Sequence, residues 1–183
     1  MIQADRLTTT SAALAWADRL ARQQSGEASP LRLALADTQV KLNRARGRAD
    51  LSAAVAHRTF ETVLSSDGPS NPRTVEWLTT TIAEYTDVGQ IDTALRLLDR
   101  VGPDFASRDF SPTNVEFHCA AAQTLIAAKR YSEAASHIQL LRRLMPTTQP
   151  TVGPSLASRL SELEQQLPAD ALLLEHAPPS STP

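Results

Sequence analysis

A regular series of prolines constrains the fold of this chain more than any other feature of its sequence. Prolines recur at intervals of 42, 40 and 42 residues: Pro30, Pro72, Pro112 and Pro154. Three of them directly follow a serine or an asparagine: Ser29, Asn71 and Ser111. Proline suits the first position of a helix, and a Ser or Asn before it can cap the N–H groups of the first turn. Each pair therefore predicts a helix start, and the even spacing predicts a repeated structural unit.

Other positions recur in register with the prolines. Seventeen residues after the first three prolines come two glycines and a lysine, a place where glycine suits a left-handed helix end: Gly47, Gly89 and Lys129. Five residues further on, each unit has a small residue: Ser52, Ala94 and Ala134. A small residue at a fixed place lets two helices approach closely. The repeated unit is therefore predicted to be a helical hairpin.

The spacing of apolar residues within each unit supports helices. Apolar residues recur every three or four positions, as in Ile91, Ala94, Leu95, Leu98 and Val101, and do not alternate as in a strand. Hydrophobic residues make up 42% of the chain and aromatic residues only 4%, which favours helices over a β-sandwich. We predict an all-α fold with about eight helices, over residues 8–24, 31–46, 51–65, 73–87, 91–101, 113–128, 132–145 and 155–167.

These helices form one predicted domain. Residues 1–7 are expected to be a frayed N-terminus, 8–167 a helical repeat domain, and 168–183 a short apolar turn followed by a disordered tail. The helix over 8–24 takes the place of the second helix of a hairpin. Either the repeats are framed the other way, or the chain is part of a longer array or complex, and both interpretations stay open.

The hairpins resemble tetratricopeptide repeats (TPR). The third unit carries the best match, with Ala122, Leu125, Tyr131, Ala134 and Pro146, and the second unit carries Tyr85, Gly89 and Ala94. The resemblance covers residues 30–146. It implies an α-solenoid of antiparallel helix pairs wound into a right-handed superhelix, with a groove that binds a protein or peptide. The repeat spacing exceeds the usual 34 or so residues, so HEAT-like packing is the alternative.

The resemblance also implies which residues face the groove. The first unit supplies Asp37, Thr38, Lys41 and Arg44, the second Thr79, Thr80, Ala83 and Thr86, and the third Cys119, Ala120, Gln123 and Ile126. Lys41, Arg44 and Arg48 also share one basic helix face. Arginine can hold a carboxylate bidentately, so this face is a candidate site for an acidic peptide. The alternative is a solvated helix end, whose C-terminal dipole favours cations.

The sequence offers little support for a catalytic site, a metal site or a nucleic-acid-binding surface. Cys119 is the only cysteine, so it cannot form an internal disulfide, and we interpret it as a small apolar residue. No two of the four histidines have the i, i+4 spacing of a zinc-binding helix. A net charge of −2 argues against nucleic acid, and no apolar run is long enough to cross a membrane. The N-terminus lacks the apolar block of a secretory signal, so we expect a cytoplasmic protein.

The function expected from the sequence is a non-enzymatic protein–protein interaction module, an adaptor or scaffold. It would need no metal or cofactor. Two alternatives stay open: a ligand- or peptide-sensing regulatory domain of a larger protein, and a structural subunit of a multiprotein assembly.

Overall fold

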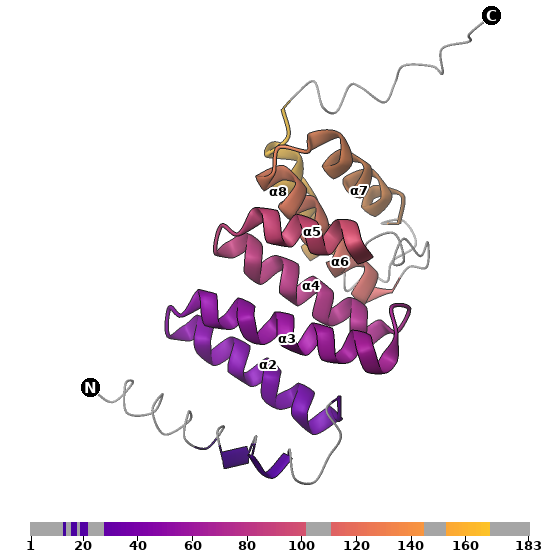
Figure 1. Cartoon of the computed structure of the whole chain (residues 1–183). Coiled ribbons are helices and arrows are strands. Elements are labelled where there is room, and N and C mark those ends of the chain that lie inside the picture. Colours follow the sequence, from indigo (N-terminus) through magenta and orange to yellow (C-terminus); the bar gives the residue numbers. More distant parts are fainter. Residues whose placement is uncertain are drawn as a thin grey trace, which may run out of the picture.

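The computed structural model describes residues 13, 16, 17, 19–21, 28–101, 111–144 and 153–168. These residues are all-helical, without any strand among them, which confirms the predicted all-α class (Figure 1). The labelled helices are α2 (Pro30–Ala45), α3 (Ala49–Asp67), α4 (Pro72–Asp87), α5 (Ile91–Val101), α6 (Pro112–Ala127), α7 (Tyr131–Leu144) and α8 (Gly153–Gln165). The predicted segment 1–7, and all but the first residue of 168–183, lie outside the described residues, as does most of the predicted helix 8–24.

Helix starts follow the proline pattern. The helices α2, α4 and α6 begin at Pro30, Pro72 and Pro112, each with the preceding side chain as its cap. Asn71 accepts a hydrogen bond from the N–H of Arg73 at 2.9 Å. The hydroxyls of Ser29 and Ser111 accept in the same way from the N–H groups of Arg32 and Asn114, at 3.4 and 3.2 Å.

The three hairpin turns are built alike. Left-handed backbone occurs in each turn, with φ values of 68°, 77° and 61° at Gly47, Gly89 and Lys129. The N–H group of each of these residues bonds the carbonyl three residues before it. The next N–H bonds the carbonyl five residues back, as in Arg48 to Asn43, Gln90 to Tyr85 and Arg130 to Leu125, at 2.8–2.9 Å. This double closure is the Schellman motif, which needs a residue in the left-handed region.

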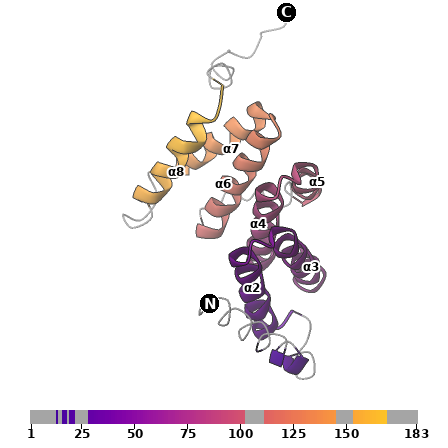
Figure 2. The same cartoon turned by 90° about the vertical axis from the view of Figure 1, so that its left-hand side faces the viewer.

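The hairpins pack one after another along the chain. The helices α2 and α3, α4 and α5, and α6 and α7 form the pairs, while α3 contacts α4, α4 contacts α6, and α8 packs on α6 and α7. Figures 1 and 2 show the helices following one another from α2 to α8. The predicted small residues lie at these contacts and are fully buried: Ser52, Ala94 and Ala134. The Ser52 hydroxyl donates to the carbonyl of Val40 across the first hairpin at 3.1 Å, so the two backbones approach closely.

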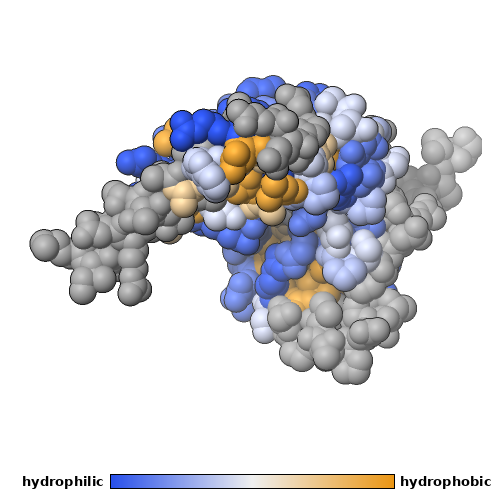
Figure 3. All heavy atoms as spheres, turned by 90° about the horizontal axis from the view of Figure 1, so that it is seen from below, coloured by the Kyte–Doolittle hydropathy of each residue, from blue (hydrophilic) through white to orange (hydrophobic). Residues whose placement is uncertain are grey.

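A continuous core joins the hairpins, with Phe60, Leu78, Phe117, Leu125 and Leu141 among its fully buried side chains. Hydrophilic side chains cover most of the coloured surface at the α2 end of the molecule, with apolar atoms between them (Figure 3). Among the residues that the structure describes, three large apolar side chains are exposed, on separate segments: Trp16, Leu31 and Leu51. Isolated exposed apolar residues are ordinary on protein surfaces. No described helix combines the length and apolar character needed to cross a membrane.

Candidate functional site

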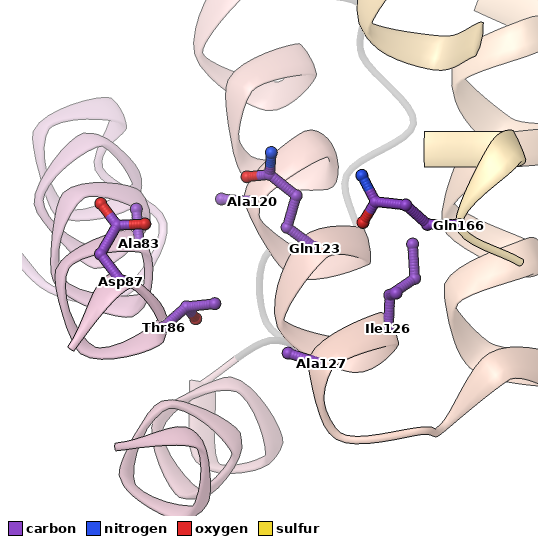
Figure 4. A pocket seen from close by; sticks show the side chains of 8 residues that line it. All are labelled: Ala83, Thr86, Asp87, Ala120, Gln123, Ile126, Ala127 and Gln166. Carbon is purple, nitrogen blue, oxygen red and sulfur yellow. The ribbon is translucent and has the colours of Figure 1, made fainter. Parts of the chain in front are cut away.

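Predicted groove residues of α4 and α6 come together around one cavity of about 260 Å³, here named the α4–α6 cavity. Its lining is Ala83, Thr86, Asp87, Ala120, Gln123, Ile126, Ala127 and Gln166 (Figure 4). Five of these eight are residues that the sequence placed on the groove: Ala83, Thr86, Ala120, Gln123 and Ile126. Apolar walls come from the alanines and Ile126, and the polar groups are a carboxylate, a hydroxyl and two amides. This is the mixture typical of a site that holds an organic group in a fixed orientation.

A second cavity of about 360 Å³ lies between α2 and α4 and is here named the α2–α4 cavity. It is lined by Pro30, Leu33, Ala34, Asp37, Arg73, Glu76, Trp77 and Thr80. The sequence predicted Asp37 and Thr80. The Arg73 guanidinium is already engaged, since its Nη2 lies 2.7 Å from Oδ2 of Asp67 and its Nη1 donates to the carbonyl of Ala28.

Helix α4 contributes to both cavities along one stripe. Glu76 and Thr80 face the α2–α4 cavity, and Ala83 and Asp87 face the α4–α6 cavity. Their spacing of four, three and four residues puts them on one face of the helix. This stripe was detectable from the sequence, yet Glu76 and Asp87 were missed. Gln166 was missed because α8 lies outside the segment that resembles the repeats.

Five predicted groove residues line neither cavity: Thr38, Lys41, Arg44, Thr79 and Cys119. Cys119 is fully buried in the core, which corrects its placement on the groove and agrees with its interpretation as a small apolar residue. Burial raises the pKa of its thiol to about 11, so Cys119 is not poised as a nucleophile. Thr38 is exposed and Thr79 half-buried, and each hydroxyl donates to the carbonyl four residues before it, at 2.8 Å.

The basic face is largely neutralised by carboxylates. The Lys41 ammonium lies 2.7 Å from Oδ2 of Asp37, one turn earlier on α2. The Arg44 guanidinium reaches α4, where its Nη2 lies 2.7 Å from Oε1 of Glu84 and 3.1 Å from Oδ2 of Asp87. Arg48 precedes α3 and is exposed. None of the three lines a cavity. Carboxylates of α2 and α4 thus pair with two of the three cations, which argues against this face as a site for an acidic ligand.

A histidine pair in the α6–α7 hairpin went unnoticed in the sequence because its members are 19 residues apart. The Nδ1 atoms of His118 and His137 are 2.8 Å apart, so one imidazole donates and the other accepts. Burial lowers the pKa of His118 to about 4, with a smaller contribution from His137. Burial also lowers the pKa of His137, against the opposing charge of Glu133. The pair is thus stable as two neutral rings.

This pair does not amount to a metal site in the described part of the chain. Two histidines are half of the four ligands that a structural zinc site uses. Nowhere in residues 28–101, 111–144 or 153–168 do three or more His, Cys, Asp or Glu side chains gather to hold an ion. The expected lack of a metal centre thus stays a prediction for the whole chain.

Comparison with known proteins found no matching family model, no matching curated protein and no matching solved structure.

Proposed function

We propose that this chain is a non-enzymatic protein–protein interaction module that binds an extended segment of another protein along α2, α4 and α6. The surface that these helices share, including the α2–α4 and α4–α6 cavities, is here named the groove. The observation that carries the proposal is that one stripe of α4 lines both cavities. Glu76 and Asp87 are eleven positions apart in the sequence, a rise of about 16 Å along a helix. An extended peptide of about five residues has this length.

Cavity size supports a peptide over a cofactor. Sites for small organic ligands usually enclose about 300–1,000 Å³ in a single concavity. Here the cavity of about 260 Å³ falls below this range and the cavity of about 360 Å³ lies near its lower end. The two lie at different places along α4 rather than in a single concavity, so each suits a side chain or two. Recognition would then combine the apolar walls with a few polar contacts in each cavity.

The repeated turns support a finer proposal about architecture. Schellman closures at the same place in three successive hairpins favour a TPR-like α-solenoid with a right-handed superhelix. In such an array the first helices line the groove, in agreement with the positions of α2, α4 and α6. A cytoplasmic location is part of the same proposal.

The test blocks the α4–α6 cavity without disturbing the core. Ala127, the last residue of α6, is exposed and lines the cavity, so Ala127→Trp should fill it. Ala54 on α3 is also exposed but lines neither cavity, so Ala54→Trp is the matched control. Both variants and the wild-type protein are applied to an array of randomised seven-residue peptides. We expect the wild type and Ala54→Trp to bind the same subset of peptides, and Ala127→Trp to lose that subset. Peptide binding that survives Ala127→Trp, or no binding by the wild type, would contradict the proposal.

A further inference from the structure

We propose that the segment held by the groove carries a basic side chain whose cation occupies the α4–α6 cavity. This inference rests on the proposed function and adds the chemistry of the partner. It reverses the charge of the ligand expected from the sequence, for reasons that three features of the groove supply.

The first feature is an excess of carboxylates. Among the described residues that line the two cavities, three carry a negative charge and one a positive charge: Asp37, Glu76, Asp87 and Arg73. The ion-pair partners of these residues and of Arg44 add two charges of each sign: Lys41, Arg44, Asp67 and Glu84. The excess of two negative charges is therefore the same with or without the partners. A groove of this sign attracts cations and repels acidic peptides.

The second feature is the meeting of three helix C-termini. Asp87 ends α4, Ala127 ends α6, and Gln166 directly follows the last residue of α8, and all three line the α4–α6 cavity. The C-terminus of a helix carries about half a negative charge, which cations stabilise. The helices α2, α5 and α7 have arginines in their last turns. The helices α4, α6 and α8, which end at the cavity, have no basic residue there. The helix α3, which ends elsewhere, also lacks one. The three C-termini at this cavity thus have no cation in their own last turns to balance them.

The third feature is a set of acceptors around the cavity. The Asp87 carboxylate engages Arg44 through Oδ2, and its other oxygen, Oδ1, has no bond among the described residues. The amides of Gln123 and Gln166 are exposed and likewise make no side-chain bond within the described part of the chain. Figure 4 shows these three side chains coming from α4, from α6 and from the end of α8 around one space. A guanidinium has five N–H donors in a plane, enough to reach a carboxylate and amide oxygens together.

Arg44 does not itself supply the cation that balances the negative charge at the α4–α6 cavity. Its Nη2 lies between the Glu84 and Asp87 carboxylates, so one positive charge faces two negative charges. The group of three therefore keeps a net charge of −1 beside the cavity. A second cation from a partner would balance it.

The experiment compares three pools of seven-residue peptides with acetylated and amidated ends. The central residue is Arg, Glu or Gln, and the other positions are randomised in the same way. Binding to the full chain is measured by fluorescence anisotropy. We expect the Arg pool to bind at least about tenfold more tightly than the Glu pool, and this preference to shrink between about 50 and 500 mM NaCl.

Two opposite changes at one exposed position locate the cation. Gln123→Lys places a tethered ammonium at the cavity and should weaken binding of the Arg pool by about tenfold, whereas Gln123→Glu should strengthen it a few-fold. Gln139→Lys on α7, which lines neither cavity, adds the same charge elsewhere and should leave affinity within about twofold.

The outcomes separate this inference from the proposed function. Equal binding of the three pools, a preference for Glu, or an unchanged Arg-pool affinity in Gln123→Lys would overturn the basic ligand and leave peptide binding intact. Failure of all three pools to bind would overturn both proposals.

Discussion

Replacing Arg44 with methionine should lower the free energy of unfolding by about 2 kcal/mol. The Glu84 side chain on α4 is only 3% exposed, and its Oε1 lies 2.7 Å from Nη2 of Arg44 on α2. Methionine keeps much of the unbranched stem of arginine but removes the charge. Glu84 would then stay buried without a cation, at the contact between two hairpins.

The magnitude follows from the exposure of the two partners. Removing one member of a fully buried ion pair costs about 3–5 kcal/mol, because the remaining charge is desolvated and unpaired. Losing an exposed pair costs about 0.2–1 kcal/mol. The Arg44 side chain is 56% exposed, so water can partly replace it, and the cost falls between these ranges. The contact of Arg44 with Asp87 joins two exposed side chains and adds little.

The assay is urea unfolding followed by circular dichroism, for wild type, Arg44→Met, Glu84→Gln and the double variant. Because the two residues interact directly, the double variant should lose about 1–2 kcal/mol less than the sum of the single losses. Asp87→Asn, which removes only the exposed partner, should cost less than about 1 kcal/mol. A loss below about 0.5 kcal/mol in Arg44→Met, or strictly additive losses, would refute the assignment of Arg44 as a link between α2 and α4.

Three more predictions concern the hairpins. Lys129→Gly should raise the free energy of unfolding by about 1 kcal/mol, because Lys129 has φ of 61° where the other two turns have glycine; equal or lower stability in urea would contradict this. Ala134→Leu should lower it by about 1–3 kcal/mol through overpacking of a fully buried position, while Ala54→Leu at an exposed position should be nearly neutral; equal effects of the two would argue against a close helix contact. Acidification should destabilise the chain through His118, whose pKa falls from 6.5 to about 4 on folding. Because the unfolded state binds this proton more tightly, stability is complete above pH 6.5 and about 3 kcal/mol is lost as the pH falls to 4. His118→Phe should flatten that part of the pH profile, and an unchanged slope would show that His118 is not its source.

The sequence alone determined where helices begin and turn. Proline with a capping residue before it, and glycine at a left-handed turn, act through bonds between residues at most five positions apart. Such interactions depend little on the rest of the molecule, so their repetition at 42 and 40 residues predicted α2, α4 and α6 within one residue. The same logic placed Lys129 in register with Gly47 and Gly89 although its side chain disfavours that backbone.

The tertiary structure decided the charge of the groove and the burial of its neighbours. Arg44 looked like part of a basic surface because its partners, Glu84 and Asp87, lie 40 and 43 residues away. Cys119 followed the groove register, yet its side chain packs into the core, and the contact of His118 with His137 joins two helices. Ion pairing and burial depend on which surfaces meet, and contacts between distant residues leave no local pattern in a chain. Local hydrogen bonds thus determine where each repeated hairpin begins and turns. Packing between hairpins determines which charged side chains lie around the two cavities.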